Sequence, residues 1–272
     1  MNATALDTSA APAGTGLSTA MRIEVRKLAT TRTWWVLSLV ALAVGVLVTV
    51  LTVTGSEAGE HPPMDIFTGA LIGGLQTAYM ITAIVGITAV AGEYRHRTVT
   101  ASFLAVPHRG RLITAKLLVL AGYGLVVGAV IVAVCSAIAA PWLSARGMLE
   151  GGLSAGGITR AVVGGTVAIA VMTALGVALG ALLRNQLAAV GVLLVYLFAV
   201  EPLFNSISAL RPAYPYLPGG AVQALTFSGH RAFGAADGAV MLNPWLAALV
   251  LIAYAVVITA IAVRTSIRRD VS

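Results

Sequence analysis

Charged residues are scarce in this chain. Only 10% of its 272 residues are Asp, Glu, Lys or Arg, whereas 58% are hydrophobic and the mean hydropathy is +0.93. A soluble domain is about a quarter charged, so this composition excludes an ordinary soluble protein. It predicts a membrane protein.

Residues that carry chemistry are scarce as well. Cys135 is the single cysteine and lies in an apolar run, so we expect a small packing residue rather than a disulfide or thiolate metal site. The four histidines show no HExxH or GxSxG spacing, and no Gly-Lys pair exists that could complete a GxxxxGK[ST] phosphate-binding loop. The sequence therefore predicts a chain that is not an enzyme and that binds no cofactor or metal itself.

Six segments contain no ionisable side chain at all. A helix rises about 1.5 Å per residue, so crossing roughly 30 Å of hydrocarbon takes about 20 apolar residues. The segments are continuously apolar, whereas barrel strands alternate, so we expect an all-α, polytopic membrane protein with six spans. They cover residues 34–54, 66–91, 117–143, 161–183, 187–200 and 245–263, and the fifth span is predicted over 187–204. The fifth is long enough only if it continues past Glu201 and Pro202.

The distribution of basic residues predicts the topology. If both termini are cytoplasmic, the inner segments hold 13 of the 17 Lys and Arg residues, which is the asymmetry that orients membrane proteins. The basic residues follow this topology rather than one soluble domain, so we expect no nucleic-acid partner. Residues 1–16 are predicted to be a disordered tail and 264–272 a cytoplasmic one.

The missing intramembrane charges bear on function. Proton-coupled carriers generally place Asp, Glu or His inside the membrane, so their absence from the six runs disfavours proton coupling. A sodium site made of backbone carbonyls at a broken helix stays open. Gln76 and Tyr79 are the most polar side chains within the spans and are candidates for lining a pathway.

Glycines one helical turn apart recur in the spans, in GALIG (Gly69 to Gly73), GLVVG (Gly124 to Gly128) and GVALG (Gly176 to Gly180). Such pairs let neighbouring helices approach closely. With 29 glycines in the chain, each match is as readily coincidence as contact.

Two elements are expected on the cytoplasmic side. Residues 17–33 form a predicted amphipathic helix along the membrane surface, with apolar residues at helical spacing: Leu17, Met21, Val25 and Leu28. It is either a simple positive-inside anchor or a functional element.

The second cytoplasmic element is the connection 92–116, which is far longer than the two to eight residues that usually join helices. Within it Val99, Phe103 and Val106 share one helical face over residues 98–106, and Pro107 ends that short helix.

These segments resemble the permeases of ABC-2 type transporters. The resemblance rests on a glutamate that closes the second span, on the basic and apolar residues after it, and on a lysine that opens the third: Glu93, Arg95, Thr98, Leu104, Pro107, Arg109 and Lys116. The N-terminal IEVRKLATTRTWW, with Glu24, Lys27 and Arg32, and the outer Leu217 to Gly220 are similar to further elements of that family.

The resemblance implies a permease of an ATP-driven exporter for an amphiphilic drug, lipid or peptide in a bacterial cell membrane. It pairs with a second permease, as a homodimer or heterodimer, and with two ATPase subunits that hold ATP and Mg. The loop 92–116 then contains the coupling helix, with an ATPase interface formed by Glu93, Arg95, Thr98, Val99, Phe103, Leu104, Pro107 and Arg109. Glu24 and Lys27 belong to the interfacial helix beside it.

The family also implies short re-entrant helices on the outer side, in residues 201–243. They would account for a fifth span broken at Glu201 and Pro202, which are candidates for an outer gate. Equally, Glu201 is an interfacial residue where a helix ends. Two other functions stay open, namely an ion-coupled carrier and a scaffold whose basic loop only attracts anionic lipid.

Overall fold

The computed structural model describes residues 16–56, 63–96, 98, 109–148, 153–226 and 241–268. In these ranges the chain is helical and contains no strand. Six helices are long and apolar enough to cross a membrane. The all-α, polytopic architecture expected from composition is confirmed.

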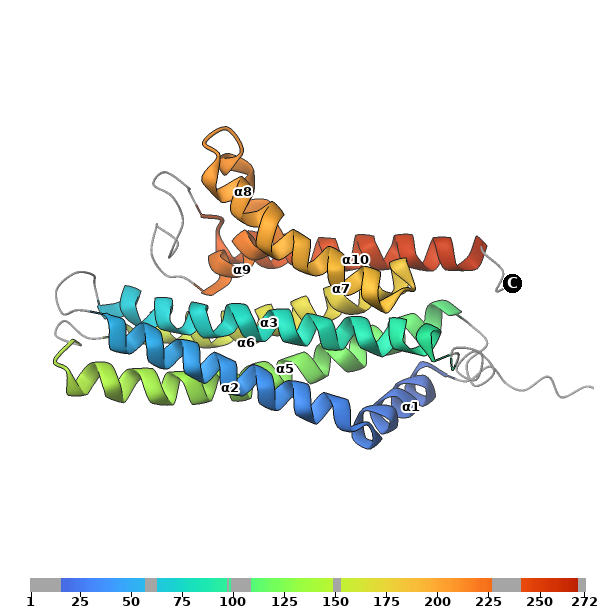
Figure 1. Cartoon of the computed structure of the whole chain (residues 1–272), viewed down its shortest axis with the longest axis horizontal. Helices are drawn as coiled ribbons and strands as arrows, with labels where there is room; N and C mark the ends of the chain where they lie inside the picture. The colour runs from blue at the N-terminus through green and yellow to red at the C-terminus, as the bar shows by residue number, and fades with distance from the viewer. Residues whose placement is uncertain are drawn as a thin grey trace, which may run out of the picture.

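The spans form one bundle, and α2, α3 and α5 extend along most of it (Figure 1). The first four are α2 (Arg32–Gly55), α3 (Pro63–Arg95), α5 (Arg109–Ala145) and α6 (Ala155–Leu183). The fifth joins α7 (Gln186–Val195), a π-helical turn (Tyr196–Val200) and α8 (Glu201–Ser206), and the sixth is α10 (Pro244–Arg268). Each helix extends a few residues beyond its apolar run.

The two ends of the bundle differ. At one end, named here the charged end, lie α1 (Leu17–Thr30), the junctions α3–α5 and α6–α7, and the end of α10 (Figure 1). At the other, the proline-rich end, the chain after α8 forms the 3-10 helix η2 (Arg211–Tyr216) and α9 (Pro218–Thr226). Both ends of the described chain therefore lie on the same side, as six crossings require.

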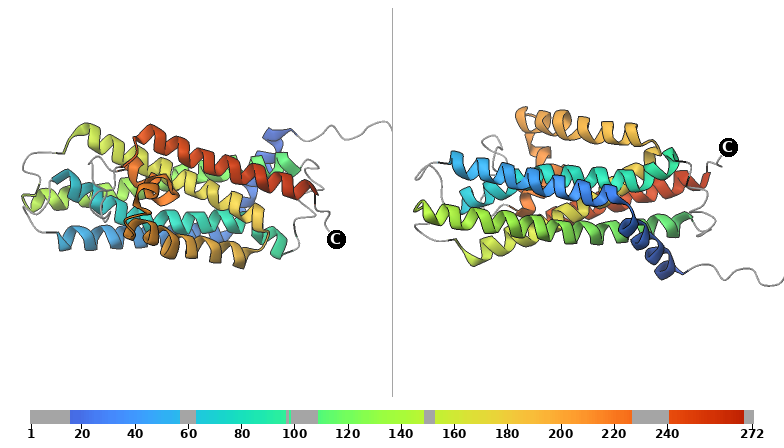
Figure 2. Two further views of the ribbon diagram at one scale, coloured as in Figure 1. Left: turned by 90° about the horizontal axis from the view of Figure 1, so that it is seen from above. Right: turned by 60° about the horizontal axis from the view of Figure 1, so that its bottom comes forward.

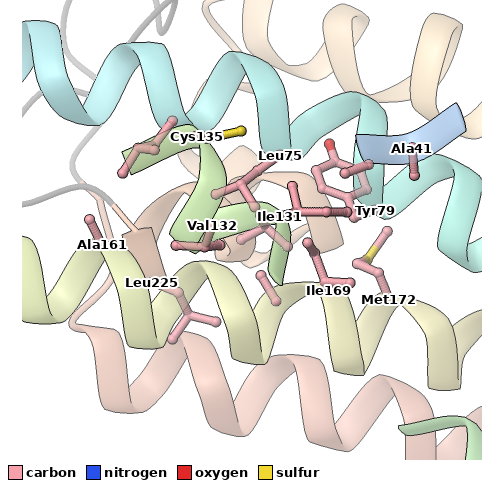
Figure 3. Packing of buried hydrophobic residues seen from close by; sticks show 14 of the residues in the cluster. Ala41, Leu75, Tyr79, Ile131, Val132, Cys135, Ala161, Ile169, Met172 and Leu225 are labelled. Carbon is pink, nitrogen blue, oxygen red and sulfur yellow. The ribbon is translucent and has the colours of Figure 1, made fainter. Parts of the chain in front are cut away.

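The centre of the bundle is formed by α3 and α6, which are mostly buried and pack most extensively on each other. Figure 3 shows the apolar core around them, in which Leu75, Ile169 and Met172 are fully buried beside Cys135. Cys135 is thus a packing residue of the core, as expected.

Two of the three glycine pairs are helix contacts. A Cβ on Gly176 would lie 2.0 Å from the carbonyl oxygen of Ala83, and one on Gly180 would lie 2.9 Å from that of Ile87, so α6 meets α3 backbone to backbone. Gly124 and Gly128 also bring α5 against the backbone of α6, where their Cβ positions would lie 2.8 Å from Ala170 Cα and 3.1 Å from the carbonyl oxygen of Thr166, whereas Gly73 meets only side chains of α2.

The fifth span corrects one expectation. The break at Glu201 and Pro202 does not occur, because the backbone stays helical through Ser206. Proline lacks an N–H and its ring clashes with the carbonyl four residues earlier. Here the helix widens just before Pro202, where the N–H of Glu201 bonds to the carbonyl of Tyr196 five residues back. The span then leaves the bundle at an angle (Figure 1).

Candidate functional site

Four charged side chains meet at the charged end and form what we name the ion ring: Glu24 and Lys27 of α1, Glu93 of α3 and Lys116 of α5. The Lys116 ammonium lies 2.7 Å from Glu24 Oε2 and 2.8 Å from Glu93 Oε1. Lys27 closes the ring at 2.8 Å from Glu24 Oε1 and 2.8 Å from Glu93 Oε1. Each carboxylate thus holds both ammonium groups, and the ring joins three helices.

Burial makes the members of the ring depend on one another. The Lys116 side chain is 3% exposed and gives its remaining hydrogen bond to the carbonyl oxygen of Ala89, at 3.3 Å. Its three donors are thus satisfied. A buried charge is tolerated only when it is paired and hydrogen-bonded. Removing either ammonium group therefore leaves two negative carboxylates with only one positive charge to balance them.

Lys27 lies at the rim of the ring, where its side chain is 39% exposed. Burial alone would lower the pKa of Lys27, but its hydrogen bonds to Glu24 and Glu93 and their negative charges outweigh that effect and raise the pKa above the ordinary 10.5. Lys27 is therefore charged at every physiological pH.

A cleft of about 760 Å³ opens beside the ion ring. Apolar side chains from α1, α2 and α5 form much of its wall, among them Leu28, Trp34 and Leu120. The α3 side contributes Arg95, His96 and Thr98, the last described residues before α5. The cleft therefore lies where the long connection leaves the bundle.

The predicted interface residues have different positions. Glu93 lies in the ring, the exposed Arg95 bonds to Gln186 of α7 at 3.4 Å, and the Thr98 N–H bonds to the Glu93 carbonyl at 2.9 Å. Arg109 begins α5. Four further predicted interface residues lie outside the described residues: Val99, Phe103, Leu104 and Pro107. The same holds for the predicted helix 98–106, apart from Thr98.

Sequence reasoning named Lys116 only as the residue that opens the third span. A lysine two turns inside an apolar helix, with no acidic residue on the same helix nearby, needs a partner from elsewhere in the fold. The sequence therefore indicates that Lys116 needs an acidic partner, but it does not identify which glutamate forms the ion pair.

The α1 helix packs against the bundle with Ala20, Met21, Ile23 and Leu28 as well as with its two ring residues. Ala20 and Glu24 are buried against α5, next to Leu112 and Ala115, whereas Leu17 and Val25 are exposed. The exposed side is mixed, because Arg22 and Arg26 lie on it as well. Apolar and basic residues together suit a helix at a membrane boundary.

At the proline-rich end, Glu201 is 5% exposed, and its Oε1 accepts a hydrogen bond from the N–H of Gly219 in α9, at 2.6 Å. Pro202 follows inside the same helix. In α3, Gln76 is exposed, whereas Tyr79 is buried in the core. The interpretation of Glu201 as a helix end is therefore wrong, because the helix continues for five residues.

A family model for ABC-2 family transporter proteins matches residues 20–200, about two thirds of the chain. The chain belongs to this family. The match runs from α1 through the first four spans into the fifth, so it includes all four residues of the ion ring. Among curated proteins, none matches the chain significantly.

Membership identifies the chain as an ABC-2 type permease, a multi-pass membrane subunit. Such permeases are generally not catalytic themselves and generally act with an ABC ATPase.

Proposed function

We propose that this permease belongs to an ATP-driven exporter of an amphiphilic drug, lipid or peptide, energised by two separate ATPase subunits that bind ATP and Mg. The observation that supports it most is the position of the ion ring. Glu93 lies in the last turn of α3 and Lys116 in the second turn of α5, so the ring joins the two ends of the connection that we propose as the ATPase contact.

The ring offers a route for force. A push on the connection moves the end of α3 and the start of α5, and Glu24 and Lys27 join both to α1. Because the four charges hold each other in a closed set, the three helices shift together. Rigid-body tilting of packed helices is a common form of such transitions.

The charged end faces the cytoplasm in this proposal. Most basic residues of the described chain gather there, including Arg26, Arg32, Arg95, Arg111 and Arg184. Retention of basic segments in the cytoplasm then places both termini inside and the proline-rich end outside, in a bacterial cell membrane.

A stripe along α3 points to the second permease. The less buried residues of this otherwise buried helix recur at helical spacing: Gln76, Thr77, Met80, Ile84 and Thr88. Gln76 is exposed in the middle third of the helix, where an amide facing lipid is costly. We therefore expect a second permease to cover this stripe, with Gln76 on the pathway between the two.

The experiment uses two matched substitutions in the connection. Helical spacing over 98–106 puts Phe103 on the apolar face and Ala101 on the opposite one. Phe103→Asp is expected to abolish co-purification of the ATPase and its ATP hydrolysis, while Ala101→Asp adds the same charge and leaves both in place. A complex that withstands Phe103→Asp refutes the coupling assignment.

One observation favours a second candidate, an ion-coupled carrier. The six apolar runs contain no ionisable residue, but the fifth span extends beyond its run and includes the buried Glu201. Intramembrane carboxylates often mark proton pathways. Transport that stops with a proton ionophore but continues after ATP depletion would identify a carrier, and the opposite pattern an ATP-driven permease.

A further inference from the structure

The α9 helix, Pro218–Thr226, is short but almost entirely buried at the proline-rich end. Its first turn leaves backbone N–H groups without partners inside the helix, as every helix does. One of them is satisfied by another element, because Gly219 donates to Glu201 Oε1 at 2.6 Å. The fit is tight, since a Cβ on Gly219 would lie 1.9 Å from Glu201 Oε2.

The other end of α9 is held by a cation. Arg160 Nη2 donates to the carbonyl oxygen of Ala224 at 2.9 Å. One turn further along α6, a Cβ on Gly164 would lie 2.3 Å from the carbonyl oxygen of Leu225, so the two backbones touch. A carboxyl group at the N-terminus and a guanidinium at the C-terminus both complement the helix dipole.

These two side chains come from different spans. Glu201 belongs to the fifth span and Arg160 to the fourth, and α9 packs extensively against α6 and α10 (Figure 2). The attachment to α6 combines a hydrogen bond with backbone contact. The attachment to α8 depends on Glu201, whose carboxyl group is the polar link between them.

A small pocket lies between α3 and α9. Gln76 and Tyr79 of α3 share a cavity of about 10 Å³ with Val222, Gln223 and Thr226 of α9. The buried Gln223 Oε1 has no hydrogen-bond partner there. An unsatisfied buried acceptor destabilises the closed arrangement, so the contacts at the two ends of α9 have to offset it.

We propose that Glu201 and Arg160 are positioning residues that clamp α9 over the Gln76 pocket, and that the Glu201–Gly219 contact is the one that separates when the fifth span moves. The α9 helix then stays with α6 and α10 while α8 departs. The clamp follows from the contacts alone, whereas its release rests on the permease function proposed above.

Amide hydrogen exchange in α9, measured on the full chain in lipid nanodiscs without an ATPase, tests the clamp. Loss of one backbone hydrogen bond is expected to raise the exchange rate about tenfold in Glu201→Leu and about fivefold in Arg160→Met. Glu201→Gln keeps an acceptor for the Gly219 N–H and should remain within about twofold of the wild type.

Arg146→Met is the matched control at the same end. Arg146 donates to the carbonyl oxygens of Val53, Thr54 and Ser56 and so caps α2 rather than α9. It should raise exchange at the end of α2 only. The clamp is refuted if α9 exchanges at the wild-type rate in both Glu201→Leu and Arg160→Met, or if Arg146→Met loosens α9 as much as they do.

A labelling experiment adds a readout beyond stability. With Cys135→Ser as background, Val222→Cys places one thiol beneath α9, where Val222 is buried. A membrane-impermeant maleimide should label this thiol slowly in the background that keeps Glu201 and in Glu201→Gln. In Glu201→Leu the labelling should be at least tenfold faster. Equal labelling in all three overturns the positioning role. These measurements need no ATP, so their failure is distinct from a failure of the proposed transport.

Discussion

The two ends of the bundle are joined in different ways. At the charged end, four side chains of opposite charge connect α1, α3 and α5. At the proline-rich end, α9 meets its neighbours through close backbone contacts at glycines and through single hydrogen bonds at its two ends.

Side chains and backbones respond differently to motion. Long charged side chains can change conformation while the same ion pairs persist, so the three helices of the ion ring can move together and stay connected. Backbone contacts at glycine have no such freedom, so the proline-rich end is either closed or open. This contrast suits an end that receives force and another that acts as a gate.

The largest effect is expected at the centre of the ion ring. Lys116→Met leaves Glu24 and Glu93 buried with Lys27 alone and should lower the free energy of unfolding by about 3 to 5 kcal/mol. Thermal unfolding in detergent measures the loss. Combining it with Glu24→Gln and Glu93→Gln removes the unpaired charges, so most of the stability should return. A single variant as stable as the wild type contradicts the ring.

A smaller effect is expected where α6 meets α9. Gly164→Ala forces a methyl group against the carbonyl of Leu225 and should cost about 1 to 3 kcal/mol. Its matched control is Gly122→Ala, since no atom lies within 4 Å of the added methyl. Removing a glycine from a helix should there raise stability by about 0.5 to 1 kcal/mol. Equal effects of both variants would show that α6 and α9 are not in backbone contact.

The smallest effect is expected at the rim of the ring. Lys27 binds the same two carboxylates as Lys116 but is 39% exposed, so Lys27→Met should cost about 1 kcal/mol or less. Because its partners raise the pKa of Lys27, this contribution is complete below its ordinary pKa of 10.5 and is lost only as pH rises through the raised value. The melting difference from the wild type should thus stay constant between about pH 7 and pH 9. A difference that disappears in this range argues against the pairing.

The spans could be predicted because each is a local property. A run of about 20 apolar residues satisfies the membrane whatever surrounds it, and the structure extends the runs by only a few residues at most ends. The gathering of basic residues at one end of the bundle also follows from the local sequence, because they lie in alternate connections between the spans. The glycine spacing left contact and coincidence equally open, and the structure shows contacts at Gly124 and Gly176.

The pairings could not be predicted, because they join residues far apart in the sequence. Lys116 lies 92 positions from Glu24, and Gly219 lies 18 from Glu201. Nothing in the local pattern selects these partners. The predicted break in the fifth span was wrong for a different reason. Proline usually interrupts a helix, but here a π-helical turn just before Pro202 accommodates its ring.

The central claim is that force entering at the charged end opens the proline-rich end. Amide exchange in α9, measured on the permease in complex with its ATPase, tests it most directly. Addition of ATP should raise the exchange of residues 218–226, because the fifth span releases Gly219. Identical α9 exchange with and without ATP, in a complex that hydrolyses ATP, would contradict the account.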